Sequence, residues 1–192
     1  KKAFETAFIA HKNIKRKSGE SYISHPLSVA KIISKEIGLG ALAIKCALLH
    51  DVVEDSEIKL KEIENLFGKK VSNIIDGLTK ISDLVDGASS IQAENFRKML
   101  LTLSNDVNVI LIKLADRLDN MRTLEHLEDR KRKKIASETL YIYAPLAHRL
   151  GLYSIKTELE DLSLKYTEKE KYFEISNKLS LLITSNLSKF FA

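Results

Sequence analysis

The sequence predicts an all-α protein, a single bundle of about ten helices, and three observations support this. The 192 residues include only 2 prolines and 7 glycines, so the residues that interrupt helices are scarce. Apolar residues recur at three- and four-residue spacing along most of the chain, and this is the period of a helix rather than a strand. No low-complexity stretch or linker divides the sequence, so one domain is expected over 1–192.

The N-terminal segments show how each element is predicted. A first helix is expected over 2–15, followed by a polar loop over 16–21. Ser24 is expected to cap the next helix, because its hydroxyl can accept from a free backbone N–H group. Pro26 fits the first turn of that helix, and Gly38 is expected to end it.

The segment 41–54 is almost wholly apolar until His50, which predicts a third helix that is buried on most of its faces. Further along, Gly68 separates two short helices, and Asp106 is expected to cap a long one. The polar stretch 82–90 is expected to form a loop. The remaining predicted helices are 59–67, 70–81, 91–104, 107–124, 130–150, interrupted or ended near Pro145 and Gly151, and 153–191 with a break near Thr167.

The composition is that of an ordinary globular protein, with 44% hydrophobic and 30% charged residues. The net charge of +5 is modest, and it suits a polyanionic small molecule, a nucleic acid or no charged partner at all. The basic run 130–134 resembles a nucleic-acid patch. We favour a solvated helix face instead, because acidic and apolar residues follow immediately.

Cys46 is the single cysteine, so an intramolecular disulfide is impossible and a reducing cytosolic environment is the default expectation. Its apolar neighbours predict that Cys46 is a small core residue. No apolar run approaches the roughly 20 residues that a membrane-spanning helix needs, so no membrane span is expected.

The apolar segment 41–54 ends in four ionisable side chains: His50, Asp51, Glu54 and Asp55. In a continuous helix, Glu54 lies one turn beyond His50 and Asp55 one turn beyond Asp51, so both pairs project toward one region. Crowded carboxylates repel one another unless a cation neutralises them. Imidazole and carboxylate together suit Mn²⁺, Fe²⁺ or Zn²⁺, which makes this segment a candidate metal site.

A second polar cluster interrupts another apolar helix at Asp116. This residue follows a mostly apolar stretch, so it is expected to be buried, and a buried carboxylate needs a partner. Asn120 lies one turn further and can share the same face. His25, directly before Pro26, is a third candidate.

Each candidate also has a purely structural explanation. Glu54 and Asp55 can be solvated acids at a helix end, Asp116 can pair with a neighbouring arginine, and His25 can cap its own helix. Taken singly, the structural explanation is favoured for each, and only the two clusters together raise the case for a metal site. The remaining histidines lack comparable neighbours and are expected to be structural or surface residues: His11, His126 and His148.

At these positions the sequence resembles the HD phosphohydrolases, whose signature is a histidine, an adjacent His-Asp pair and a distant aspartate. His25, His50-Asp51 and Asp116 match it in order. The flanking segments narrow the resemblance to the hydrolase domain of the RelA/SpoT homologue family. These segments are 16–19, 22–26, 50–55, 76–80, 93–99, 113–123 and 143–151.

The resemblance implies an all-α HD domain that hydrolyses (p)ppGpp at the ribose 3′ position, giving pyrophosphate and GDP or GTP. It implies one Mn²⁺ per chain, held by His25, His50, Asp51 and Asp116. Glu54 and Asp55 match the catalytic acidic pair of the family. The residues that match substrate contacts are Arg16, Lys17, Tyr22, Asn120 and Thr123.

The same resemblance implies a setting for the domain. The segment 160–163 resembles the connector toward the synthetase domain of long members, so about 152–192 is expected to be a helical connector to a covalently linked synthetase. A cytoplasmic enzyme without a membrane or nucleic-acid partner is expected. The alternatives are an HD phosphohydrolase for other nucleotides and a non-catalytic alarmone-binding regulatory domain.

Two residues depart from the family pattern. Ser21 stands where the family often has proline, so a looser loop is expected. Asp119 stands where the family usually has histidine. Asp119 is not a predicted ligand, so activity is expected to survive. Its negative charge is expected to weaken substrate binding if the side chain points toward the pocket.

Overall fold

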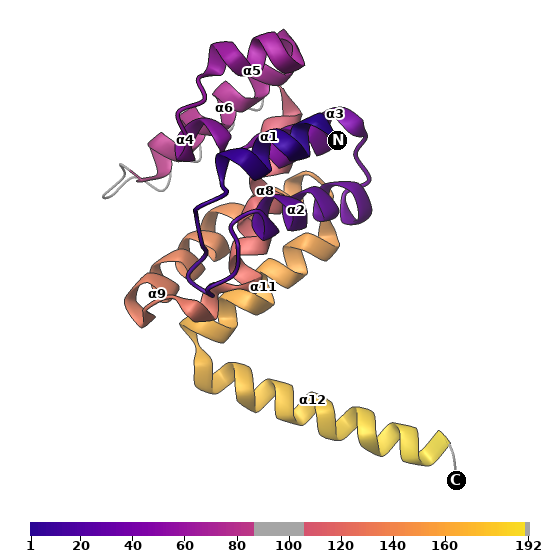
Figure 1. The fold of residues 1–192 in the computed structure, drawn as a ribbon. Coiled ribbons are helices and arrows are strands. Elements are labelled where there is room, and N and C mark those ends of the chain that lie inside the picture. The colour runs from indigo at the N-terminus through magenta and orange to yellow at the C-terminus, as the bar shows by residue number, and fades with distance from the viewer. Residues whose placement is uncertain (87–105, 191–192) are drawn as a thin grey trace. The chain divides into compact units, whose positions relative to one another are not determined.

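The structure, a computed structural model, describes residues 1–86 and 106–190 (Figure 1). Within these two ranges the regular elements are helices, and an isolated antiparallel bridge between Lys15 and Ser21 is the single β-type pairing. The predicted all-α class is therefore confirmed. The chain divides into two compact units, Lys1–His126 and Leu127–Ala192, and each is described by itself.

The first unit is a bundle of helices that packs around α3. Its elements are α1 (Lys2–Ala10), α2 (Ser24–Lys31), the π-helical turn η1 (Ile32–Glu36), α3 (Ala41–Leu49), α4 (Val52–Asp55), α5 (Leu60–Phe67), α6 (Lys69–Asp86), α8 (Val107–Arg122) and the 3-10 turn η2 (Leu124–His126).

Helix α3 contacts α1, α2, α6 and α8, so it lies at the centre of this unit. Small buried residues such as Ala43, Cys46 and Ala47 let the neighbouring helices approach it closely. The larger side chains of the core are fully buried around it: Ile32, Ile33, Leu49, Ile63, Ile74, Ile75, Leu78, Ile110, Ile112, Leu114 and Leu118. Both α3 and α8 are therefore held by close packing, which fixes the positions of the polar residues at their ends.

The N-terminal region differs from the prediction in two places. Helix α1 ends at Ala10 rather than near residue 15, and the chain returns through a loop closed by backbone hydrogen bonds, including Tyr22 N–H to Ile14 O at 3.0 Å. The prediction that Ser24 caps α2 is wrong. The chain is already helical at Ile23, and the Ser24 hydroxyl donates to Ser21 O at 2.9 Å instead.

Gly38 follows η1 with a φ of +81°, a conformation that glycine adopts without strain, and the helix ends there as predicted. The predicted continuous helix 41–54 is wrong near its C-terminal end. α3 ends at Leu49 and α4 begins at Val52, so the His50-Asp51 pair lies in the break. The Asp51 carbonyl starts the new helix by accepting from Asp55 N–H at 2.8 Å.

The polar stretch predicted as a loop is partly helical, because α6 continues to Asp86. Residues 87–90 and the predicted helix 91–104 lie outside the described ranges. Asp106 caps α8 as predicted, and its carboxylate accepts from Asn108 N–H at 2.9 Å.

The second unit holds α9 (Asp129–Glu138), the π-helical turn η3 (Thr139–Tyr143), α10 (Ala144–Arg149), α11 (Tyr153–Thr167) and α12 (Lys169–Phe190). The predicted break near Thr167 is present between α11 and α12. The basic run of α9 is largely exposed, and Lys133 pairs with Asp129 at 3.1 Å. In the described ranges, no helix combines the length and apolar character that crossing a membrane requires.

Candidate metal centre

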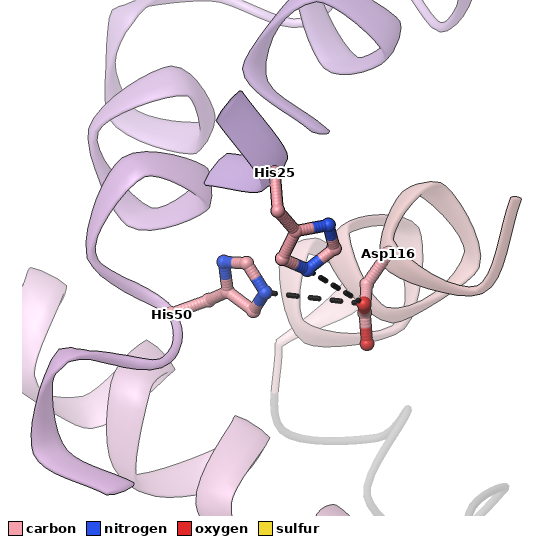
Figure 2. A group of neighbouring side chains, drawn as sticks. All are labelled: His25, His50 and Asp116. Atoms are coloured by element: carbon pink, nitrogen blue, oxygen red, sulfur yellow. Dashed lines mark ion pairs between the residues drawn. The ribbon is translucent and has the colours of Figure 1, made fainter. Parts of the chain in front are cut away.

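Three helices of the first unit bring His25, His50 and Asp116 together (Figure 2). His25 lies in the first turn of α2, His50 directly follows α3, and Asp116 lies within α8. Both imidazoles point toward one carboxylate oxygen: Asp116 Oδ1 is 3.2 Å from His25 Nε2 and 3.9 Å from His50 Nε2. All three residues are buried, so the group is shielded from solvent.

Asp51, the fourth predicted ligand, lies against the same two imidazoles. Its Oδ2 atom is 3.0 Å from His50 Nε2 and 3.7 Å from His25 Nε2. The break between α3 and α4 explains this placement: the Asp51 side chain makes no capping bond to α4 and turns to the cluster. The Tyr22 hydroxyl donates to the same oxygen at 2.7 Å. The structure thus brings all four predicted ligands together.

The remaining ring nitrogens fix how the two imidazoles are oriented. His50 Nδ1 lies 2.8 Å from the main-chain oxygen of Ala47, and His25 Nδ1 lies 2.6 Å from Asp119 Oδ2. Because these partners accept hydrogen bonds, each Nδ1 carries the proton and each Nε2 faces the carboxylates. His50 Nε2 is buried and makes no hydrogen bond of good geometry within the described residues, although Asp51 lies nearby.

The pKa values of both imidazoles are raised and that of Asp51 is lowered, because the cluster holds several carboxylates beside two histidines. Burial lowers the pKa of His25, but hydrogen bonds to Asp116 and Asp119 outweigh it and hold the pKa at about 9. Burial is likewise outweighed at His50, whose pKa is raised by Asp51 and Asp116. Burial raises the pKa of Asp51, yet the nearby positive charge of His50 brings that pKa down to about 2.

The donor set fits a divalent cation. Two protonated imidazoles supply the positive charge that the buried carboxylates need, and one divalent cation supplies the same charge in place of two protons. Two imidazole nitrogens and two carboxylates are ligands for Mn²⁺, Fe²⁺ or Zn²⁺. The incompletely hydrogen-bonded His50 Nε2 is the atom that such a cation would satisfy.

Four of the five predicted substrate residues lie beside this cluster. Arg16 reaches from the 11–23 loop to the end of α8, where its Nη2 donates to Thr123 Oγ1 at 2.9 Å and Asn120 Oδ1 at 3.3 Å. Asn120 Nδ2 in turn donates to Asp116 Oδ1 at 2.7 Å. Tyr22 is joined through Asp51. Lys17, the fifth, is an exposed residue of the same loop.

The predicted acidic pair lies at the end of α4, and both residues are exposed. Burial of the inner part of the Asp55 side chain and the charge of Asp51 raise the pKa of Asp55. His11 Nε2 lies 3.7 Å from Asp55 Oδ2, and the His11 ring packs on Tyr22 with 4.8 Å between ring centroids. The sequence predicted that His11 is either a structural or a surface residue. His11 is buried, and it borders the site.

Two charged residues of α8 belong to the cluster although neither was predicted as a site residue. Lys113 Nζ lies 2.9 Å from Asp116 Oδ2, and together with hydrogen bonding it keeps the pKa of Asp116 well below its usual range despite burial. Asp119 points inward, to His25 and Arg16. The sequence spacing could have predicted both residues. Each lies three positions from Asp116 and therefore on the same face of the helix.

Comparisons with known proteins agree with this geometry. A family model described as HD domain matches residues 3–153. A guanosine-3′,5′-bis(diphosphate) 3′-pyrophosphohydrolase of Aquifex aeolicus is 49% identical over 176 residues, which are 92% of this chain and 25% of that protein. A GTP pyrophosphokinase of Myxococcus xanthus is 48% identical over 184 residues, 94% of this chain and 24% of that protein.

The fold has a counterpart among solved structures. A structure described as a metazoan ortholog of SpoT that hydrolyzes ppGpp superimposes with a TM-score of 0.58 and 23% identity, covering 91% of this chain and 93% of that one. At this identity the likeness supports the fold alone. The chain spans about a quarter of the length of the curated relatives that it matches. Because the family model covers most of its length, including all four residues of the signature, the chain belongs to the HD domain family.

Proposed function

We propose that this domain is a metal-dependent phosphohydrolase that removes pyrophosphate from the ribose 3′ position of (p)ppGpp and leaves GDP or GTP. One observation carries the proposal: His25, His50 and Asp116, from three helices, form a buried cluster, and the Asp51 carboxylate lies against both imidazoles. The substrate is supported by the names of relatives that are nearly half identical to this chain, two of which are called 3′-pyrophosphohydrolases.

The resident cation is proposed to be a single Mn²⁺, held by His25, His50, Asp51 and Asp116. A divalent cation at such a site supplies a Lewis acid for the phosphate and lowers the pKa of a bound water. Nitrogen and oxygen donors without a thiolate are compatible with Mn²⁺, and the nearest thiol, Cys46, is buried in the core.

The protein's own groups are assigned by their chemistry. Glu54 is proposed as the group that takes a proton from the attacking water or orients it, with Asp55 beside it. The pKa of Asp55 is raised toward neutral pH, and this shift favours proton transfer by that carboxyl group. Arg16 supports substrate binding, because a guanidinium can stack on a flat base as well as pair with phosphate.

The wider setting is also a proposal. We infer that the full protein links this domain to a synthetase, since relatives about four times longer include proteins named GTP pyrophosphokinase. Residues from about 152 onward are proposed as the connector. Exposed apolar side chains on α12 support this role, because they suit packing against a further domain: Phe173, Ile175, Leu179, Leu181 and Leu182. A reduced, buried Cys46 suits the cytoplasm.

The test is turnover of ppGpp by the chelator-treated protein before and after addition of Mn²⁺. We expect pyrophosphate release only after Mn²⁺ is added, and we expect GTP and deoxynucleoside phosphates to remain intact. Asp116→Ala should abolish metal loading in elemental analysis, whereas Asp129→Ala, which changes an exposed carboxylate of α9, should load normally. A Mn²⁺-loaded parent protein that binds ppGpp without releasing pyrophosphate would indicate a regulatory domain and refute the enzyme.

A further inference from the structure

Asp119 lies outside the proposed ligand set, yet its carboxylate touches both a candidate metal ligand, His25, and a candidate substrate residue, Arg16. It lies on α8, one turn beyond Asp116, and is only 5% exposed. A single oxygen, Oδ2, lies 2.6 Å from His25 Nδ1 and 2.8 Å from Arg16 Nη1. The residue that breaks the family pattern is therefore an integral part of the cluster.

The His25 ring is held between two carboxylates of the same helix. Asp119 Oδ2 accepts a hydrogen bond from Nδ1–H, and Asp116 Oδ1 lies 3.2 Å from Nε2 on the opposite edge of the ring. With Nδ1 donating to Asp119, Nε2 is the ring nitrogen that faces the other three proposed ligands, and it can bind a cation once its proton is released. A carboxylate in this position fixes the tautomer of a ligating histidine and makes its free nitrogen a better donor.

The two imidazoles are oriented by different kinds of acceptor. His50 donates to the main-chain oxygen of Ala47, which belongs to the rigid helix α3. His25 depends on the Asp119 side chain, which Arg16 holds in place from the other direction. Arg16 is itself anchored at Thr123 Oγ1, 2.9 Å away, so Asp119 is restrained on both sides.

We propose that Asp119 is a positioning residue that aims His25 Nε2 at the metal and, through the same oxygen, ties that ligand to Arg16. This inference rests on the proposed metal site and adds a residue that the HD signature does not contain. The sequence predicted only that an inward Asp119 weakens substrate binding. At the metal we expect the carboxylate to strengthen the site, because its charge is matched by Arg16 and directed at His25.

The first test measures Mn²⁺ affinity directly by calorimetry on the chelator-treated protein, without substrate. We expect Asp119→Ala to weaken Mn²⁺ binding by ~10- to 100-fold, the usual effect of losing the outer partner of a ligating histidine. Asp119→Asn keeps the shape and one acceptor oxygen but loses the charge, so an intermediate loss is expected. This variant also serves if Asp119→Ala does not fold.

Asp106→Ala is the matched control. It removes the N-cap of the same helix, where the Asp106 carboxylate accepts from Asn108 N–H, without touching the cluster. We expect Mn²⁺ affinity to stay at the parent value in this variant. If Asp106→Ala weakened binding as much as Asp119→Asn, general loosening of α8 would explain both results and the inference would be overturned.

A second test separates the two contacts of Asp119. Arg16→Ala should raise the KM for ppGpp and should weaken Mn²⁺ binding less than Asp119→Ala does, because His25 keeps its acceptor although that acceptor loses one restraint. Asp119→Asn should lower Mn²⁺ affinity, and the visible spectrum of its Co²⁺-substituted form should shift with the changed ligand field. An unaltered Co²⁺ spectrum together with parental Mn²⁺ affinity refutes the positioning role. Failure of the parent protein itself to bind Mn²⁺ refutes the metal site instead.

Discussion

The hydrogen bond from Tyr22 to Asp51 offers a test that keeps every packed atom in place. Tyr22→Phe removes one hydroxyl that donates to Asp51 Oδ2 at 2.7 Å. The ring remains, so its contacts with His11 and His25, at centroid distances of 4.8 and 5.8 Å, are preserved. Burial and the charge of Asp51 raise the pKa of Tyr22, so the hydroxyl is a protonated donor throughout the neutral range.

The expected magnitude follows from the partners that remain. A hydrogen bond to a charged group contributes roughly 1.5–3 kcal/mol. After the substitution the Asp51 carboxylate still lies 3.0 Å from His50 Nε2, so it is not left isolated. The lower end of this energy range is therefore expected. We therefore expect the free energy of unfolding of the metal-free protein to fall by about 1.5 kcal/mol. With a urea m-value of about 2 kcal/mol per molar, the midpoint falls by roughly 0.7 M.

The assay is urea unfolding followed by circular dichroism in the presence of a chelator. Tyr141→Phe is the control, because Tyr141 is 65% exposed. Equal midpoints for the two variants would refute the idea that Tyr22 stabilises the Asp51 carboxylate. A loss above ~4 kcal/mol, the range of large core truncations, would also contradict the reasoning, since no cavity is created.

Four other predictions follow from named contacts. Gly77→Ala should lower stability by about 1 kcal/mol in urea unfolding, because the new Cβ would lie 3.0 Å from Val109 Cγ2 and this overpacking exceeds the gain in helix propensity; a more stable variant would contradict this. Burial raises the pKa of Cys46 to about 12, so a thiol reagent at neutral pH should label it only after unfolding, and rapid native labelling would count against the buried assignment. Glu54→Ala should retain Mn²⁺ in elemental analysis yet lose turnover by at least ~10²-fold, and near-parental turnover would remove Glu54 as the base. The pKa of His25 is raised from 6.5 to about 9, so its protonation stabilises the metal-free fold fully below pH 6.5 and the contribution is lost as pH rises through 9; urea midpoints that do not fall across this window would refute it.

Local sequence patterns predicted the elements whose ends are set by backbone chemistry. Gly38 ends a helix by adopting a positive φ, and Asp106 caps α8 with its own carboxylate. Ser24 was misassigned because a hydroxyl near a helix start can either cap the first turn or donate to a carbonyl. The backbone of Ile23, already helical, decides between them, and that conformation is a tertiary outcome.

The candidate site was predictable as a set of residues but not as a geometry. The four residues of the HD signature lie close together, as the resemblance implied. Helical periodicity alone could not predict that these segments meet. The break at His50-Asp51 was missed because an apolar helix carries no local signal that it stops, and Asp51 O simply starts a new helix. The inward direction of Asp119 depends on Arg16 arriving from a loop more than a hundred residues earlier in the chain.

The contrast between the acceptors of His25 and His50 has a genetic consequence. A main-chain oxygen exists whatever side chain position 47 carries, so no single codon change there deletes the partner of His50. The partner of His25 is a side chain, and one nucleotide substitution can replace it. Natural variants are therefore expected to differ in metal affinity mainly through His25, which makes that half of the centre the more readily tuned by mutation.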